Sequence, residues 1–191
     1  MELPRMAALA EVQWTMPDLK NYENFLQRIP QMVKTYDMKG YNYATHVFDV
    51  TATFNPDTVK NALMITLKTI DNADVHYTLD GTEPTSASPL YKEPIAITAS
   101  CTFKARAVRG EKLGRVIGEK IKFNKASMKP ITMLKPINKQ YEFGGAPTLV
   151  DGLKGNGNYK TGRWIAFYRN DMEAVIDLRK EMEISKVAIS P

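Results

Sequence analysis

The period of the hydrophobic pattern changes along this 191-residue chain, and that change constrains the fold more than any other feature. Up to about residue 40 the apolar residues recur every three or four positions, which is typical of amphipathic helices. From about Val47 to Phe123 they alternate every second position, which is typical of strands with one buried face. The chain is therefore predicted to be mainly β, with two helices before the strands.

The two predicted helices each carry one apolar row. The first row consists of Leu3, Met6, Ala7 and Ala10. The second row extends from Leu19 to Tyr36. Two short helices cannot bury two such rows against each other alone, so we expect them to need a further surface to pack on. If that surface is absent, the exposed row could support self-association.

Local signals predict where the second helix begins and ends. Thr15 and Asp18 are expected to cap it, with Pro17 tolerated in its first turn. Pro30 lies inside the periodic pattern and is expected to kink or end the helix, because proline removes a backbone donor. Gly40 is expected to stop it.

The region with period two predicts several short strands. They are expected at residues 63–67, 75–79, 95–97, 102–108 and 116–123. Asp80-Gly81 and Arg109-Gly110 are turn signals between them. Short strands at this spacing, separated by glycine and proline, indicate a β-sandwich.

The last third of the chain differs in composition from the sandwich region. Residues 125–135 are expected to form a linker, and a glycine-rich stretch follows. Three further strands are expected at 164–168, 174–178 and 184–189. Three strands form a marginal sheet in water, so residues 136–191 are interpreted as part of a larger β-domain.

Composition and charge exclude several classes of function. The chain has 26 Lys and Arg against 21 Asp and Glu, a net charge of +5 without a basic stripe, so no nucleic-acid partner is expected. No apolar run is long enough for a membrane span, and the N-terminal residues do not resemble a signal peptide. Cys101 is the single cysteine, so no internal disulfide forms.

No constellation for catalysis or cofactor binding is found in the sequence. Asp171 and Glu173 lie in a turn-like stretch and are interpreted as solvated acids. His46 and His76 lack a second ligand at metal spacing, and Cys101 is interpreted as a small packed residue. The glycines from 152 to 162 lack the spacing of a phosphate-binding loop. We therefore expect no cofactor, no metal and no catalytic residue.

The segment from Pro4 to Trp14 resembles the closing part of the catalytic barrel of family 20 glycoside hydrolases, the β-N-acetylhexosaminidases. In that family a Pro-Arg pair, small residues and then Ala-Glu-x-x-Trp mark the last barrel helix. The resemblance implies that residues 1–45 are the helical tail of a (β/α)8 barrel. Arg5, Glu11 and Trp14 are interpreted as structural, with a role for Glu11 and Trp14 in the pocket as the alternative.

The segment from Tyr77 to Thr85 resembles the signature of the chitobiase/β-hexosaminidase C-terminal domain. Residues 88–91 and 103–108 continue the resemblance. It implies an immunoglobulin-like β-sandwich over residues 46–124 with no catalytic role. Within it, Asp80-Gly81 is expected to turn a hairpin, and Pro84 is expected to end the strand pairing.

A third resemblance covers Leu149 to Gly152, then Thr161 and Trp164, which are similar to the opening of a discoidin-like, or galactose-binding-like, domain. It implies that residues 136–191 are an incomplete domain of this type. In related modules an Asp-Gly pair lies at a structural calcium site, which makes Asp151 a weak calcium candidate. The alternative is that Asp151 simply forms a turn.

These resemblances imply a non-catalytic C-terminal region of an enzyme that removes terminal N-acetylhexosamine residues from glycans. The adjacent Asp-Glu pair of that family is absent here, so the chain alone is predicted to be inactive. The family also implies export to the periplasm or cell surface. The alternative function is a stand-alone carbohydrate-binding or interaction module, with sugar stacking expected at Trp164, Tyr159 and Tyr168.

Overall fold

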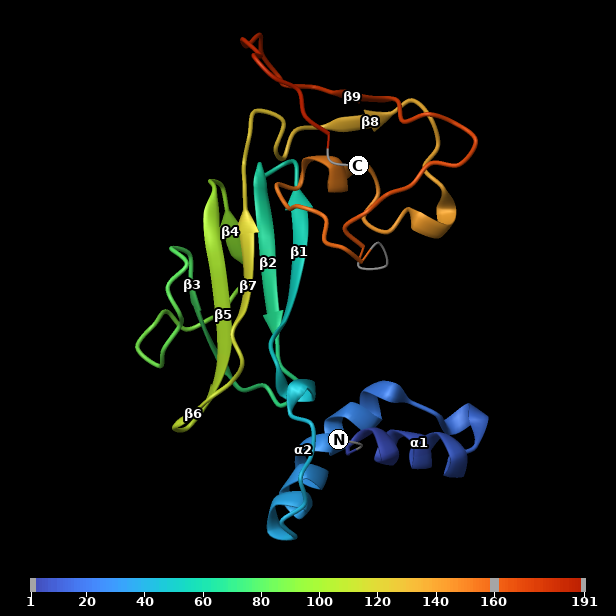
Figure 1. Cartoon of the computed structure of the whole chain (residues 1–191), viewed down its shortest axis with the longest axis vertical. Coiled ribbons are helices and arrows are strands. Elements are labelled where there is room, and N and C mark those ends of the chain that lie inside the picture. The colour runs from blue at the N-terminus through green and yellow to red at the C-terminus, as the bar shows by residue number, and fades with distance from the viewer. Residues whose placement is uncertain (1–2, 159–161, 190–191) are drawn as a thin grey trace.

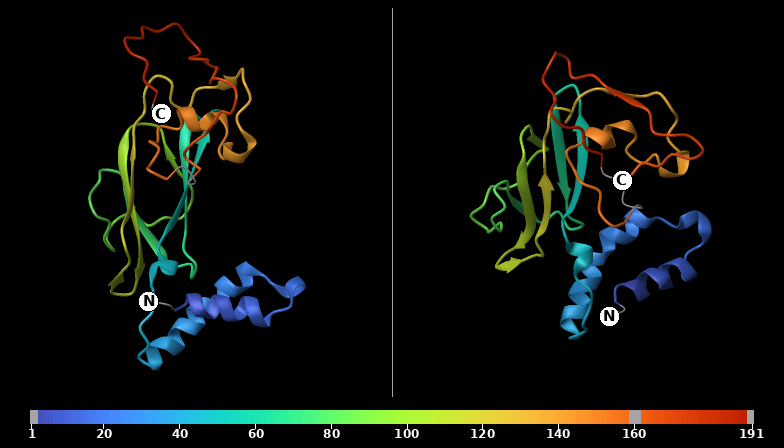
Figure 2. Two further views of the ribbon diagram at one scale, coloured as in Figure 1. Left: turned by 45° about the vertical axis from the view of Figure 1, so that its right-hand side comes forward. Right: turned by 45° about the horizontal axis from the view of Figure 1, so that its top comes forward.

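The computed structural model describes residues 3–158 and 162–189, and it is mainly β (Figure 1). Two helices lie at one end of the long axis, a two-sheet β-sandwich occupies the middle, and a small C-terminal unit lies at the other end (Figures 1 and 2). This confirms the mainly β fold with two leading helices. No helix in the described part of the chain is long and apolar enough to cross a membrane.

The helices are α1, Arg5–Trp14, and α2, Tyr22–Met38. The predicted caps of α2 are wrong, because Asn21 caps it and accepts a hydrogen bond from the backbone N–H of Asn24 at 3.0 Å. Thr15 instead lies at the C-terminal end of α1.

The predicted break at Pro30 is also wrong, because α2 continues through it. The apolar residues Phe25, Ile29 and Val33 are buried on one side of α2 and hold both halves of the helix in place. The predicted stop at Gly40 is confirmed. Gly40 has a φ of +67° and donates to the carbonyl of Asp37, which is how glycine commonly closes a helix.

The sandwich consists of two antiparallel sheets. The first sheet is ordered β1-β2-β4, with β1 Thr51–Asp57, β2 Ala62–Lys68 and β4 Ile95–Ile97. In the second sheet β5 lies between β3 and β7 and also pairs with β6, with β3 Asp74–Thr78, β5 Cys101–Arg109, β6 Lys112–Leu113 and β7 Ile117–Ile121. The strands at 63–67, 75–79, 95–97, 102–108 and 116–123 are thus confirmed with small shifts, and β1 and β6 were not predicted.

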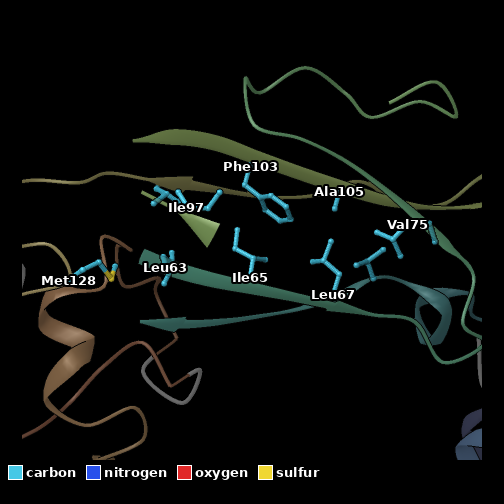
Figure 3. Packing of buried hydrophobic residues seen from close by; sticks show 11 residues of the cluster. Leu63, Ile65, Leu67, Val75, Ile97, Phe103, Ala105 and Met128 are labelled. Carbon is cyan, nitrogen blue, oxygen red and sulfur yellow. The ribbon is translucent and has the colours of Figure 1, made fainter. Parts of the chain in front are cut away.

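The core of the molecule lies between these two sheets (Figure 3). Phe103 is fully buried at its centre, and its ring meets that of Phe54 edge to face at 6.1 Å between centroids. Leu63 and Ile65 from β2 face it and are also fully buried. Burial of each such side chain stabilises the fold by about 1.5–3 kcal/mol.

The two predicted turns have different outcomes. Arg109-Gly110 does turn the hairpin from β5 to β6. Asp80-Gly81 does not turn a hairpin, because β3 pairs with β5 and a long loop follows Asp80. The Asp80 carboxylate accepts hydrogen bonds from the backbone N–H and the hydroxyl of Thr82, which forms a local turn in that loop. Pro84 is buried within the same loop.

The C-terminal unit contains one two-stranded ribbon, formed by β8, Ile131–Met133, and β9, Ala174–Ile176. Short 3-10 helices lie at Lys139–Tyr141 and at Ala146–Val150, the latter labelled η4. The strand predicted at 174–178 is confirmed in part. The strands predicted at 164–168 and 184–189 are wrong for the described residues, because neither segment pairs with another strand. Within the segment predicted as a linker, Met128 is buried and β8 begins at Ile131.

Candidate functional site

The helical residues singled out by the barrel-like motif do not converge. Glu11 on α1 forms an ion pair with Arg28 on α2 at 2.5 Å, and the Nε of Arg28 donates to the amide oxygen of Asn24 at 3.0 Å. Arg5 is exposed, and Trp14 is 88% exposed. Glu11 therefore links the two helices, and its partner Arg28 was not predicted, because their pairing spans 17 positions of sequence.

The helices present an apolar surface to solvent. Its members are each more than half exposed, and we call this set the open helical face. They are Met6, Leu9, Val12, Trp14, Met16, Leu19 and Tyr22. Large apolar side chains that are exposed in such numbers are typical of a region where another protein surface packs.

The junction between the helices and the sandwich is built around Arg109, at the end of β5. Its guanidinium donates to both carboxylate oxygens of Asp71, at 2.6 and 2.8 Å, and to the carbonyl of Phe48 at 2.9 Å. It also lies over the Phe48 ring at 5.5 Å. Phe48 and Ile70 in turn pack against the buried residues of α2. One side chain therefore ties the sandwich to the segment that leaves the helices.

The electrostatics of this junction favour the ionised pair. The hydrogen bond from Arg109 lowers the pKa of Asp71, against the opposing effect of burial. The same hydrogen bond raises the pKa of Arg109. Both side chains are less than a third exposed. A bidentate ion pair of this type is stronger than an ion pair on the surface.

A second arginine, Arg163, lies at the junction between the sandwich and the C-terminal unit. Its guanidinium forms an ion pair with Glu119 of β7 at 2.7 Å and lies over the Phe54 ring of β1 at 5.4 Å. Both charged side chains are 21% exposed. Arg163 was not predicted as a functional residue, because neither Glu119 nor Phe54 lies near it in sequence.

Backbone contacts join the same two parts. The N–H of Met128 donates to the carbonyl of Val150, and the N–H of Lys122 donates to the carbonyl of Gly152, both at 2.8 Å. Gly152 has a φ of +75°, and a Cβ atom there would lie 2.8 Å from the Phe123 ring. Met128 is buried in the core of the sandwich, so the C-terminal unit and the sandwich share one hydrophobic cluster.

Asp151, the calcium candidate, is 7% exposed beside this junction. Burial raises the pKa of its carboxyl to about 6, although the positive charge of Arg163 acts in the opposite direction. One carboxylate oxygen accepts a hydrogen bond from the backbone N–H of Leu153 at 2.8 Å, which is the geometry of a turn. Among residues 3–158 and 162–189, no group of three His, Cys, Asp or Glu side chains is placed to hold a metal ion.

The aromatic candidates for sugar stacking differ in their surroundings. The Trp164 ring is partly buried against Gly155, and its indole N–H donates to the carbonyl of Asn156 at 2.9 Å. Tyr168 is 63% exposed, with the Arg169 guanidinium 5.0 Å from its ring centre. Tyr159 lies outside the described residues. Tyr168 therefore offers the more accessible of the two described rings.

The remaining residues considered for catalysis do not form a site. His76 is partly buried, and its Nδ1 lies 2.7 Å from the carbonyl of Ser88. Burial raises the pKa of the Cys101 thiol, which disfavours the reactive thiolate. Asp171 is exposed, and Glu173 lies 3.8 Å from the ammonium of Lys135. These surroundings are those of structural or solvated groups.

Two open hollows in the described surface lie beside the C-terminal unit. One, of about 410 Å³, is lined by residues 133–137 together with Lys139, Glu142 and Ala146. The other, of about 440 Å³, is lined by residues 58, 59, 61, 128–130 and 179. The first contains one carboxylate and the second contains none. Neither therefore offers the two carboxyl groups that most glycoside hydrolases place on either side of the scissile bond.

Comparisons with known proteins agree with this architecture. Residues 65–121, from the middle of β2 to the end of β7, match the family described as Fn3 associated. The chain is also 33% identical over 128 residues to a β-hexosaminidase of Porphyromonas gingivalis, which covers 63% of this chain and 16% of that protein. The chain thus spans about one sixth of the length of this relative. Part of the sandwich is therefore similar to the Fn3-associated family, and part of the chain is related to a β-hexosaminidase.

Proposed function

We propose that this chain is the non-catalytic C-terminal region of a β-N-acetylhexosaminidase of glycoside hydrolase family 20. In this proposal the larger enzyme removes terminal N-acetylhexosamine residues from glycans and is exported to the periplasm or cell surface. The region itself supplies no catalytic residue. It provides the last helices of the catalytic barrel and the β-domains that follow them.

The extent of the similarity is the observation that carries the proposal. The match to the β-hexosaminidase covers 128 residues, more than twice the length of the Fn3-associated match at 65–121. The likeness therefore includes segments outside that domain. A widespread β-module attached to an unrelated protein would account for similarity within the module alone.

The open helical face supports the assignment of residues 1–45 to a barrel. Its seven apolar side chains are exposed here, and helices on the outside of a (β/α)8 barrel bury one face against the barrel strands. We further assign residues 46–124 to an immunoglobulin-like sandwich, 125–135 to a connection and 136–191 to part of a discoidin-like domain. The exposed apolar residues of the C-terminal unit, such as Val175 and Val187, fit a domain whose packing needs further chain.

Hydrolysis of a chromogenic N-acetyl-β-glucosaminide tests the proposal. The purified 191-residue chain is expected to give no turnover above buffer, whereas an active β-hexosaminidase in the same assay gives a strong signal. Turnover that co-elutes with the chain on two unrelated chromatography columns would contradict the proposal. The two columns guard against a contaminating hydrolase from the expression host.

Glycan binding by the chain alone is the second candidate, and the exposure of Tyr168 favours it. Titration with N-acetylglucosamine oligomers, followed by calorimetry, tests this candidate. A heat signal that Tyr168→Ala abolishes, and that Tyr141→Ala does not, would support it. The absence of heat at millimolar oligosaccharide would exclude it.

A further inference from the structure

Two arginines join the sandwich to its two neighbours, the helices and the C-terminal unit. Arg109 lies at the end of β5 and contacts Phe48 in the segment that leaves the helices, whereas Arg163 of the C-terminal unit contacts Glu119 and Phe54, each in the middle of its strand. Each guanidinium forms an ion pair with a carboxylate and lies within 5.5 Å of a phenylalanine ring. The residues that each arginine contacts lie far from it in sequence.

We propose that the sandwich is a rigid strut that fixes the C-terminal unit relative to the helices, with Arg109 and Arg163 as its two positioning residues. Neighbouring domains in one chain move relative to each other by default, unless their interface is large and hydrophobic. Here the two arginine contacts supply the restraint instead. The inference depends on the geometry of this chain and is independent of the proposed hydrolase origin.

At the helical end, the restraint comes from a planar group with three hydrogen bonds. Arg109 contacts Asp71 from the β2–β3 connection and Phe48 from the segment between α2 and β1. Phe48 and Ile70 pack on the buried face of α2, so movement of the helices would break the carboxylate and carbonyl contacts together. Lysine cannot replace this arrangement, because a single ammonium cannot match the fork of a guanidinium.

Toward the C-terminal unit, Arg163 restrains a segment that follows the backbone contacts at Val150 and Gly152. The backbone bonds at Val150 and Gly152 fix residues 146–153 against the sandwich. Arg163 attaches the chain a second time, about ten residues later, to Glu119 and Phe54 on strands of different sheets. Two separate attachments prevent rotation of the unit about either one.

Other arginines serve as matched controls. Arg115 lies 4.0 Å from Asp49 near the helical junction, but its side chain is 77% exposed. Arg179 pairs at 3.5 Å with Asp177, its neighbour in sequence, and is 65% exposed. Exposed pairs of this kind contribute little, so their loss should leave the strut intact.

Pulsed electron spin resonance between pairs of nitroxide labels measures the rigidity directly. In a Cys101→Ala background, one pair of cysteines replaces the exposed residues Glu23 on α2 and Lys92 in the sandwich. A second pair replaces Lys92 and the exposed Lys180 of the C-terminal unit. The chain with both arginines is expected to give one narrow distance distribution for each pair.

Each arginine should affect one pair of labels. Arg109→Met is expected to widen the distance distribution of the 23–92 pair about twofold and to leave that of the 92–180 pair unchanged. Arg163→Met is expected to widen the distribution of the 92–180 pair and to leave that of the 23–92 pair unchanged, because the two restraints are separate. Arg115→Met and Arg179→Met should widen neither. The double exchange Glu119→Arg with Arg163→Glu should restore part of the narrow 92–180 distribution, which a loss of folding would not allow.

Several results would contradict the proposal that the sandwich is a rigid strut. Broad distributions in the unsubstituted chain would show that the parts already move independently. Narrow distributions in the Arg109→Met and Arg163→Met variants would show that the arginines do not supply the restraint. Circular dichroism and the melting temperature of each variant verify that the sandwich remains folded during the measurement.

Discussion

The sandwich and the C-terminal unit are both β-structures, yet they bury their apolar side chains in different ways. The sandwich closes two sheets over a cluster of 11 buried residues. In the C-terminal unit the strand β9 leaves Val175 and Ile176 exposed, and Ile184 and Val187 further along are exposed as well. Its buried contacts are largely those it makes with the sandwich, through Val150, Gly152 and Arg163. The sandwich therefore stabilises itself, whereas the C-terminal unit depends on its neighbour for stability.

Among the changes that distinguish the two parts, removal of the Phe103 ring from the core should have the largest effect on stability. Phe103→Ala removes a fully buried ring between the sheets and is expected to lower the free energy of unfolding by about 3–5 kcal/mol. Urea unfolding followed by circular dichroism measures this change. Val175→Ala in the C-terminal unit is the control and should change stability by less than about 0.5 kcal/mol, since Val175 is 52% exposed. Equal effects of the two changes would contradict the account.

Gly152→Ala should separate the two parts without unfolding the sandwich. The φ of +75° and the close Phe123 ring both oppose a Cβ atom at this position, and the expected cost is about 1–3 kcal/mol. Hydrogen exchange should accelerate for residues 146–158 while β2 and β5 remain protected. Gly157→Ala is the control, because no atom lies within 4 Å of a Cβ there. Faster exchange throughout the sandwich would indicate that the two parts unfold together.

The buried Asp151 predicts a pH-dependent effect at the same junction. Its folded-state pKa of about 6 lies above the ordinary value of 3.8, so its contribution to stability is complete below pH 3.8 and is lost as the pH rises through 6. The ionised carboxyl should therefore weaken the junction at pH 7.5 by at most about 3 kcal/mol. Exchange of residues 146–158 should be faster at pH 7.5 than at pH 5 after correction for the intrinsic rate.

Asp151→Asn keeps an acceptor for the Leu153 N–H and should remove this pH dependence. The variant should also be more stable than the original chain at pH 7.5. Asp177→Asn, at an exposed carboxyl of the same unit, is the control and should leave the pH dependence unchanged. A pH dependence that persists in Asp151→Asn would show that another group is responsible.

Sequence-based prediction of strands succeeded in the sandwich and largely failed in the C-terminal unit. The strands around Leu63 and Phe103 were predicted because alternation is strong wherever one face is buried by the chain itself. The segments 164–168 and 184–189 have comparable apolar content, but within residues 3–158 and 162–189 they pair with no strand, so their pattern did not produce strands. Pro30 shows the opposite case, since burial of Ile29 and Val33 outweighs the local penalty of a proline in α2.

The candidate site was harder to predict than the fold. Asp151 and Trp164 were singled out because they lie in a local motif, and their roles as site residues stay predictions; the structure places Asp151 beside the junction of the two β-parts. Arg109 and Arg163 were missed, because each acquires its role from partners such as Asp71 or Glu119 that are distant in sequence. Only a three-dimensional arrangement assigns a function to such isolated arginines.

The mass of the polypeptide in the cells that produce it tests the central claim most directly. An antibody against the purified sandwich, used on fractionated cells, should detect a protein several times heavier than the 21.6 kDa of this chain. That protein should carry β-hexosaminidase activity into the immunoprecipitate. A single species of 21.6 kDa, with no hexosaminidase activity in the precipitate, would contradict the account.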